Sequence, residues 1–143
     1  MHKSFMRPAI HALLAALLLL SGAAFGQGKP GPKPKGTGAH NEKVEEVARE
    51  EKAKGMEYLG GGVGGKEKVI QTEGGNKESR RADLTFQDPA TKQITHHQVG
   101  LTNSKGEPIK REKEALEDIR TKADEKNRNV IFHPYTPPPP KKK

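Results

Sequence analysis

The sequence predicts an α+β fold with an α/β-like arrangement in three layers, in which helices cover a mixed sheet. Two stretches carry apolar residues at helical spacing, residues 41–54 and 109–126. Four shorter stretches have the composition or alternation of strands, namely residues 66–72, 82–86, 94–101 and 130–132. The expected order is therefore α-β-β-β-α-β, between a disordered N-terminal linker and a disordered C-terminal tail.

Composition divides the 143 residues into one domain and its flanking segments. Hydrophobic residues make up only 31% of the chain and aromatic residues 4%, but most of the proline lies in the first 40 and the last eight residues. We therefore expect a single folded domain at residues 41–135, between a Gly/Pro/Lys linker at 27–40 and a Pro/Lys tail at 136–143. A domain of about 95 residues can form one modest core.

Residues 1–26 have the pattern of a signal peptide. Two basic residues precede an apolar run of about 12 residues, from Ala9 to Leu20, and small residues follow it. The run is shorter than the roughly 20 residues of a membrane-spanning helix. We therefore expect cleavage after Ala24 or Gly26 and a secreted or periplasmic product with no stable membrane span. An uncleaved N-terminal anchor is the alternative.

The net charge of +8 comes from the flanking segments and not from the domain. Eight basic residues lie outside residues 41–135: Lys3, Arg7, Lys29, Lys33, Lys35, Lys141, Lys142 and Lys143. The other 18 are balanced by 18 acidic residues, so a basic face for nucleic acid can arise only from their arrangement. The linker lysines suit either a spacer or attachment to an anionic surface. The absence of cysteine excludes disulfides, Cys-ligated metals and a cysteine nucleophile.

A predicted hairpin forms the centre of the domain. In its first strand, apolar residues alternate with Arg81, Asp83 and Thr85, which predicts one buried and one polar face. An Asp-Pro dipeptide then breaks the strand, and residues 94–101 form the second strand. If the domain has a catalytic site, we expect it on this hairpin.

The segments around the hairpin carry weaker signals. Residues 60–65, Gly-Gly-Gly-Val-Gly-Gly, lack the preceding strand and following helix of a phosphate-binding loop, so we interpret them as a flexible turn. Pro108 suits the first position of the second helix, which is expected to end near Lys126. On this helix, Arg111 and Glu112 are expected to make surface contacts.

Four segments carry a distinctive combination of motifs: Ser79-Arg80-Arg81-Ala82-Asp83-Leu84-Thr85-Phe86, His97-Gln98-Val99-Gly100, Gly106-Glu107-Pro108-Ile109-Lys110-Arg111-Glu112 and Phe132-His133-Pro134-Tyr135. Together they resemble the C-terminal toxin domains of bacterial polymorphic toxins, of the Rhs and filamentous-haemagglutinin types. Those domains carry Arg-Arg-Pro-Asp on one strand, Val-Gly-Lys on the next, and an Arg-Glu helix. The resemblance covers residues 60–135 and implies a restriction-endonuclease-like core.

The resemblance implies a metal-dependent nuclease that acts on the phosphodiesters of DNA or RNA. Asp83 matches the acidic ligand of a divalent ion, and Gln98 would supply a second oxygen from the next strand. Glu46 on the first helix would complete an acidic pair with Asp83. Magnesium is the expected ion, and a small acidic immunity protein is an expected partner. No oligomeric state is predicted.

The sequence departs from the family pattern at Leu101, where a lysine is expected after Val-Gly. Lys105, Lys110 or Arg111 would have to orient the attacking water in its place. If none of these residues does so, the domain has lost its catalytic activity and retains only the fold. The alternative function is therefore a non-enzymatic secreted module that binds a protein partner or an envelope polymer.

Some of these residues also have plainer interpretations. Asp83 could form a surface ion pair with the neighbouring Arg81. His96 and His97 are adjacent, so on a strand they point to opposite faces, and one of them is expected to face solvent. His96 shares a face with Gln98 and is the better accessory metal ligand.

Overall fold

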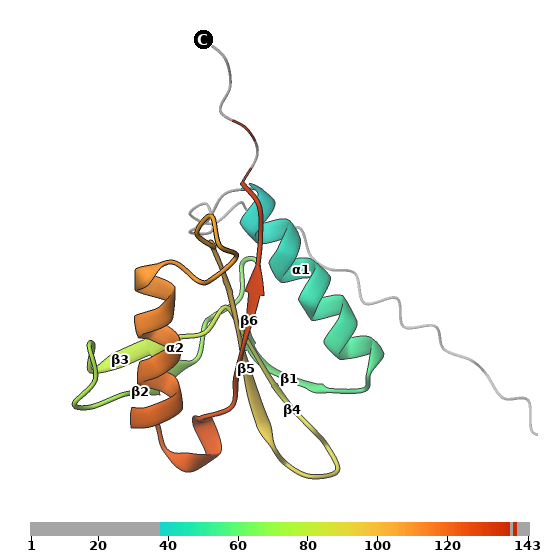
Figure 1. The fold of residues 1–143 in the computed structure, drawn as a ribbon. Coiled ribbons are helices and arrows are strands. Elements are labelled where there is room, and N and C mark those ends of the chain that lie inside the picture. Colours follow the sequence, from blue (N-terminus) through green and yellow to red (C-terminus); the bar gives the residue numbers. More distant parts are fainter. Residues whose placement is uncertain (1–37, 138, 140–143) are drawn as a thin grey trace, which may run out of the picture.

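The structure is a computed structural model that describes residues 38–137 and 139 (Figure 1). The predicted signal peptide, most of the linker and most of the tail lie outside these residues. The elements are α1 (Gly38–Ala53), β1 (Glu57–Gly61), β2 (Val69–Gln71), β3 (Ser79–Arg81), β4 (Leu84–Gln87), β5 (Ile94–Gly100), α2 (Lys110–Lys122), the 3-10 turn η1 (Glu125–Asn127) and β6 (Val130–Pro134). This combination of helices and strands confirms the predicted α+β class. In the described part of the chain, neither α-helix is long and apolar enough to cross a membrane.

The main sheet is mixed and has the strand order β1-β4-β5-β6. β4 pairs antiparallel with both β1 and β5, whereas β5 and β6 are parallel. Parallel neighbours need a crossover connection, and α2 lies in this one. β2 and β3 form a separate antiparallel pair, inserted in the chain between β1 and β4.

α1 covers one face of the main sheet through a narrow apolar stripe. Val44 and Val47 lie on the same side of the helix because they are three residues apart, and they are buried against Leu84, Phe86 and Val99. Leu84 and Phe86 alternate along β4, so both point to this face. The cluster holds α1 against β4 and β5, the two strands of the central hairpin.

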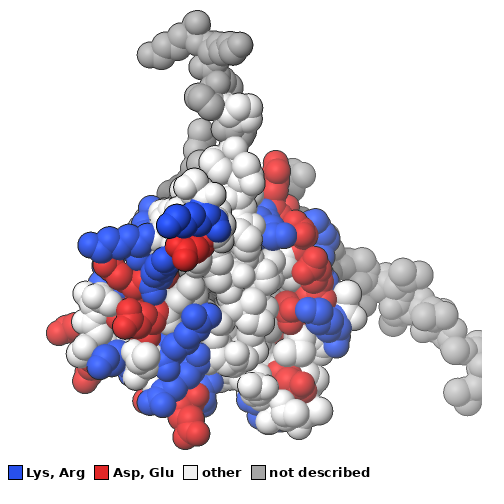
Figure 2. Space-filling model, viewed as in Figure 1, with Lys and Arg blue, Asp and Glu red and all other residues white. Residues whose placement is uncertain are grey.

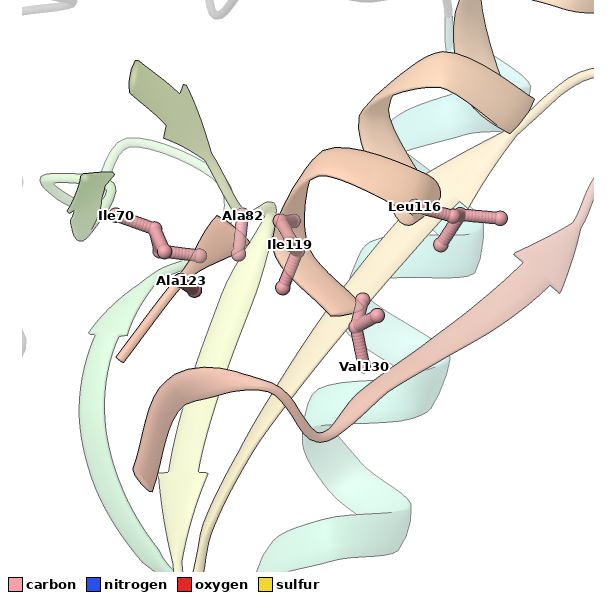
Figure 3. Packing of buried hydrophobic residues seen from close by; sticks show 6 residues of the cluster. All are labelled: Ile70, Ala82, Leu116, Ile119, Ala123 and Val130. Carbon is pink, nitrogen blue, oxygen red and sulfur yellow. The ribbon is translucent and has the colours of Figure 1, made fainter. Parts of the chain in front are cut away.

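α2 packs on the opposite face of the main sheet (Figures 1 and 3). In Figure 3, Leu116 and Ile119 of α2 lie in one cluster with Val130 of β6 and with Ile70 and Ala82 from the region of the small sheet. The main sheet therefore lies between the two helices, each with its own hydrophobic cluster.

The first strand of the predicted hairpin is divided in the structure. β3 ends at Arg81 and β4 begins at Leu84, and Ala82 packs on the α2 side whereas Leu84 packs on the α1 side. The prediction of one continuous alternating strand is therefore wrong. Thr85, expected on a polar face, is buried and hydrogen-bonds to His96.

β1 occupies a segment for which the sequence predicts a flexible turn or no strand. Gly60 and Gly61 are buried in β1 and are not part of a flexible turn. Gly61 has a φ of 90°, and a Cβ at this position would lie 2.1 Å from the carbonyl oxygen of Asp83. Only glycine allows this close approach. Residues 66–72, predicted as the first strand of the sheet, instead provide β2 outside it.

α2 is shorter than predicted. Pro108 pairs with Thr102 in an isolated β-bridge instead of opening the helix, which starts at Lys110. The helix ends at Lys122, and Glu125–Asn127 forms a separate 3-10 turn. This turn leads directly into β6.

Candidate functional site

Asp83 and Gln98 lie at the same end of the central hairpin. The last pair of the β4–β5 ladder is Leu84 with His97, so one step further the antiparallel register places Asp83 opposite Gln98. Oδ2 of Asp83 accepts a hydrogen bond of 2.7 Å from the backbone N–H of Val99. The two predicted oxygen donors therefore occupy opposite positions at this end of the hairpin. The Asp83 carboxylate contacts β5 and α1, whereas Gln98 shares a strand face with Phe132, which packs on the α2 side.

His40, in the first turn of α1, contacts the other carboxylate oxygen of Asp83. His40 Nε2 lies 3.4 Å from Asp83 Oδ1, and each side chain is 14% exposed. The hydrogen bond to Asp83 raises the pKa of His40 above its ordinary value, although burial opposes the shift. The His40 ring also meets Tyr135 edge-on, with ring centroids 5.4 Å apart. The ion-pair partner of Asp83 is therefore His40 and not Arg81.

Gln98 contributes a buried oxygen without a hydrogen bond. Its Oε1 is one of two such side-chain atoms in the described part of the chain. The parallel register sets Gln98 beside Phe132, and the alternation along β5 puts Gly100 on the same face. A buried acceptor without a donor is costly, so this atom marks a place where a cation or a water would be stabilised.

Glu112 is buried where the sequence predicts a surface residue. It is only 5% exposed, and its side chain fills the space beside Gly100, where a Cβ would lie 2.7 Å from Glu112 Cδ. Oε1 of Glu112 lies 2.8 Å from Nε of Arg111, whose side chain is 71% exposed. The surface prediction is therefore confirmed for Arg111 and wrong for Glu112.

The exposed cations of the site stand at the start of α2 and in the loop before it. The side chain of Lys110 is 91% exposed and that of Arg111 71%, and both residues lie within two positions of the buried Glu112. Lys105 is exposed in the preceding loop. Leu101, at the position where the resemblance expects a lysine, is half-buried. The lysine and arginine residues considered as substitutes for a lysine at position 101 are therefore exposed side chains of the loop and the helix.

Glu46, the third predicted metal ligand, has a different partner. Its carboxylate lies 2.8 Å from Nζ of Lys43, and this hydrogen bond is the main cause that lowers the pKa of Glu46. Asp83 pairs with His40 instead. Across residues 38–137 and 139, no three or more His, Asp or Glu side chains form a group able to hold a metal ion. A hard-metal site here would also need amide, water or substrate oxygens.

Both histidines of β5 are buried, so the prediction that one faces solvent is wrong. His96 hydrogen-bonds through its two ring nitrogens to Thr85 at 2.9 Å and to Asn127 at 3.2 Å. His97 stacks on His133, and Nδ1 of His97 lies 2.9 Å from Nε2 of His133. Burial lowers the pKa of His97 to about 4. His97 is therefore a neutral core residue at physiological pH.

Charged side chains are interspersed on the surface. On the face seen in Figure 2, Lys and Arg alternate with Asp and Glu and do not form one continuous basic patch. This distribution agrees with the balance of 18 basic and 18 acidic residues in the predicted domain. On this face, bulk charge therefore gives no sign of a nucleic-acid surface.

No protein-family model matches the chain. No curated protein and no solved structure matches it either. The likeness to polymorphic-toxin domains therefore stays a prediction from the sequence motifs.

Proposed function

We propose that the protein is a small exported bacterial effector whose domain cleaves nucleic-acid phosphodiesters with a divalent metal ion. The observation that carries this proposal is the buried Oε1 of Gln98, which has no partner and lies on the strand position opposite Asp83. A carboxylate and an amide oxygen on neighbouring strands are hard donors, which suit magnesium. The proposed site is therefore at the end of the central hairpin.

The residues present fit magnesium better than a transition metal. Magnesium is commonly held by one or two carboxylates, while waters and substrate phosphates complete its shell. On β5, His96 uses both ring nitrogens in hydrogen bonds to protein side chains. Nε2 of His97 has no hydrogen-bond partner, but His97 lies on the opposite face of the strand from Gln98. When bound, such an ion neutralises charge on the phosphate and lowers the pKa of a bound water.

The protein groups around this site would orient the ligand and bind the substrate. The N–H of Val99 and the His40 ring fix the orientation of the Asp83 carboxylate. Lys110 and Arg111 are exposed at the start of α2, where they would contact substrate phosphates. In this proposal, one of these two cations takes over the role of the missing lysine.

The topology of the main sheet supports a restriction-endonuclease-like core. Without the inserted β2–β3 pair, the order of elements is α1-β1-β4-β5-α2-β6, an α-β-β-β-α-β order in which β1 takes the place that the sequence assigns to residues 66–72. Three antiparallel strands are followed by one parallel strand after the crossover helix. Fold alone does not assign chemistry, so the proposal depends on the site.

A non-catalytic interaction module is the second candidate, and Leu101 favours it. A half-buried leucine cannot orient water, and both oxygens of Asp83 already have protein partners. Such a module would bind a partner protein or an envelope polymer. For the nuclease, a small acidic immunity protein in the producing cell is the corresponding proposed partner.

The Asp83→Asn substitution tests the nuclease directly in the full-length chain. The matched control is Asp124→Asn, because Asp124 is exposed and its side chain makes no capping hydrogen bond. With Mg²⁺, cleavage of DNA or RNA by the Asp83 variant should fall by orders of magnitude, whereas the control should cleave like the wild type. Equal cleavage by both variants would exclude Asp83 from the chemistry.

The Leu101→Lys substitution separates the two candidate functions. If Lys110 or Arg111 already orients the water, an added lysine should change the cleavage rate only modestly. If the domain is a degenerate module, the wild type should be inactive and the variant should gain weak magnesium-dependent nicking.

A further inference from the structure

We propose that the protein forms a two-fold symmetric dimer in which β6 pairs antiparallel with β6 of a second copy. This inference goes beyond the proposed function and does not depend on it. In the described part of the chain, β6 is the last strand of the main sheet and has no strand on its outer side. At the other end of the sheet, the Gly61 N–H of β1 donates to the Lys66 carbonyl at 2.9 Å, so the following loop covers part of that edge. The edge of β6 therefore presents backbone groups with which another strand can pair.

The surface over β6 lacks the charges that usually prevent such pairing. β6 has the sequence Val-Ile-Phe-His-Pro, without Lys, Arg, Asp or Glu. In Figure 2, a strip without charged side chains runs down the middle of the molecule, where Figure 1 shows β6, and charged side chains lie on both sides of it. Ile131 of this strand is 43% exposed. An uncharged strip with a charged rim is typical of a surface that binds protein.

The hydrogen bonds between β6 and β5 establish which backbone groups of β6 point outward. The N–H of His96 donates to the Asn129 carbonyl, and the N–H of Tyr135 donates to the Gly100 carbonyl. In a parallel pair, alternate residues of a strand bond to its neighbour. The odd-numbered residues of β6 therefore face β5. The even-numbered residues turn their backbone groups outward, namely Val130, Phe132 and Pro134.

These outward groups are complementary to themselves. Pro134 has no N–H to donate, and the Val130 carbonyl already accepts a hydrogen bond of 3.3 Å from Nη2 of Arg120. In an antiparallel pair centred on Phe132, Val130 lies opposite Pro134 of the second copy, so the missing donor faces the carbonyl that has another donor. The two Phe132 residues then exchange both backbone hydrogen bonds, and each Val130 N–H donates to a Pro134 carbonyl. This self-complementarity identifies a second copy of the chain as the occupant.

The side chains also match in this register. Phe132 packs with the α2 cluster, so the two Phe132 rings would face each other on the α2 side of the joined sheet. Ile131 of each copy would lie opposite His133 of the other on the α1 side, which covers part of the exposed isoleucine. The rim carries charges of both signs in Figure 2, so the two copies do not meet through one common charge.

Sedimentation equilibrium of the full-length chain over roughly 1–100 μM tests the dimer, because small interfaces associate weakly. The wild type should show a monomer–dimer equilibrium. Ile131→Lys places two like charges in the uncharged strip and should weaken dimerisation at least about tenfold. The control Val69→Lys, at a 49% exposed position of β2 outside the main sheet, should associate like the wild type.

Two outcomes of this experiment would overturn the proposal. Association through any other surface would survive the Ile131→Lys exchange, so normal dimerisation of that variant would exclude the β6 edge. A wild type that stays monomeric throughout would exclude the dimer and leave the edge to a strand of another protein. Circular dichroism of each variant checks that it remains folded.

Cross-linking tests the register independently. The chain has no cysteine, so Ile131→Cys introduces one thiol per copy. In a pair centred on Phe132 the two thiols occupy diagonal positions about 7–8 Å apart, within reach of a short bismaleimide. Covalent dimers should form with Ile131→Cys and not with the control Val69→Cys. Arg120→Met removes the donor to the Val130 carbonyl and should weaken dimerisation about tenfold. Failure of Ile131→Cys to cross-link, or unchanged association of Arg120→Met, would overturn this pairing.

Discussion

Gly100 and Glu112 meet in a close contact, because a Cβ at position 100 would lie 2.7 Å from Glu112 Cδ and 2.8 Å from the ring of Phe132. Through this contact, the end of β5 packs against the first turn of α2. Gly100→Ala should therefore lower the free energy of unfolding by about 1–3 kcal/mol through overpacking. The control Gly38→Ala has no atom within 4 Å of the new Cβ and should stay within about 0.5 kcal/mol of the wild type. Urea denaturation measures both, and equal midpoints would contradict this contact.

Asp118 anchors the β2–β3 hairpin to α2. Its side chain is 2% exposed and accepts hydrogen bonds from Nε of Arg80 at 2.8 Å and from the N–H groups of Asn76 and Lys77. Asp118→Asn should cost about 3 kcal/mol, because it leaves a buried guanidinium without its anion. Chemical denaturation measures this cost, and a loss no larger than that of Asp124→Asn would contradict it.

Asp118 also predicts a loss of stability in acid. Burial, the largest single effect, raises the pKa of Asp118, but the hydrogen bonds from Asn76, Arg80 and Lys77 together lower it below its ordinary 3.8. The stabilisation is therefore present above pH 3.8 and is lost as the pH falls through the lower folded-state value. In Asp118→Asn, unfolding followed from neutral pH into acid should show a smaller loss than in the wild type.

His97 predicts a second pH dependence at higher pH. Burial lowers its pKa from 6.5 to about 4, while Glu51 acts in the opposite direction and His133 and Lys54 act with burial. Between these values the unfolded chain binds a proton that the folded chain does not, so stability falls as the pH decreases from 6.5 to 4. The loss is on the order of 3 kcal/mol. His97→Gln should flatten the dependence of the unfolding free energy on pH across this window, and an unchanged slope would count against it.

His40 predicts a pH dependence of stability that is opposite in sign to that of His97. The hydrogen bond to Asp83 raises the pKa of His40 above 6.5, so its stabilisation is present below that value and is lost as the pH rises through the folded-state pKa. His40→Ala should therefore destabilise the protein by up to about 1 kcal/mol in mild acid and by less in mild alkali. Thermal unfolding on both sides of neutrality measures the difference. A cost that grows with pH would contradict the ion pair.

Local patterns were sufficient to predict the elements whose apolar residues repeat regularly. The spacing of Leu116 and Ile119 predicts α2, and the β-branched run at residues 94–101 predicts β5. β1 could not be predicted in this way, because Gly60 and Gly61 have low strand propensity. Their place in the sheet is set by the close approach of Asp83, which no local window contains.

The candidate site could be predicted only in part, because several of its contacts join residues that are far apart in the sequence. Asp83 and Gln98 could be paired because the hairpin between them is local, and the register places them at opposite positions. The contacts of His40 with Asp83 and of Glu112 with Gly100 depend on how each helix packs on the sheet. The one signal for the second contact is a glycine at the end of a strand, which often marks a close approach of another group.

Cleavage of nucleic acid by the wild-type full-length chain tests the central claim most directly. Plasmid DNA and a single-stranded RNA would each be incubated with the purified protein in Mg²⁺, in Mn²⁺ and in EDTA. The proposed site predicts cleavage of at least one substrate with a divalent ion and none in EDTA. No cleavage under any of these conditions, by a protein with a folded circular-dichroism spectrum, would contradict the nuclease and leave the interaction module.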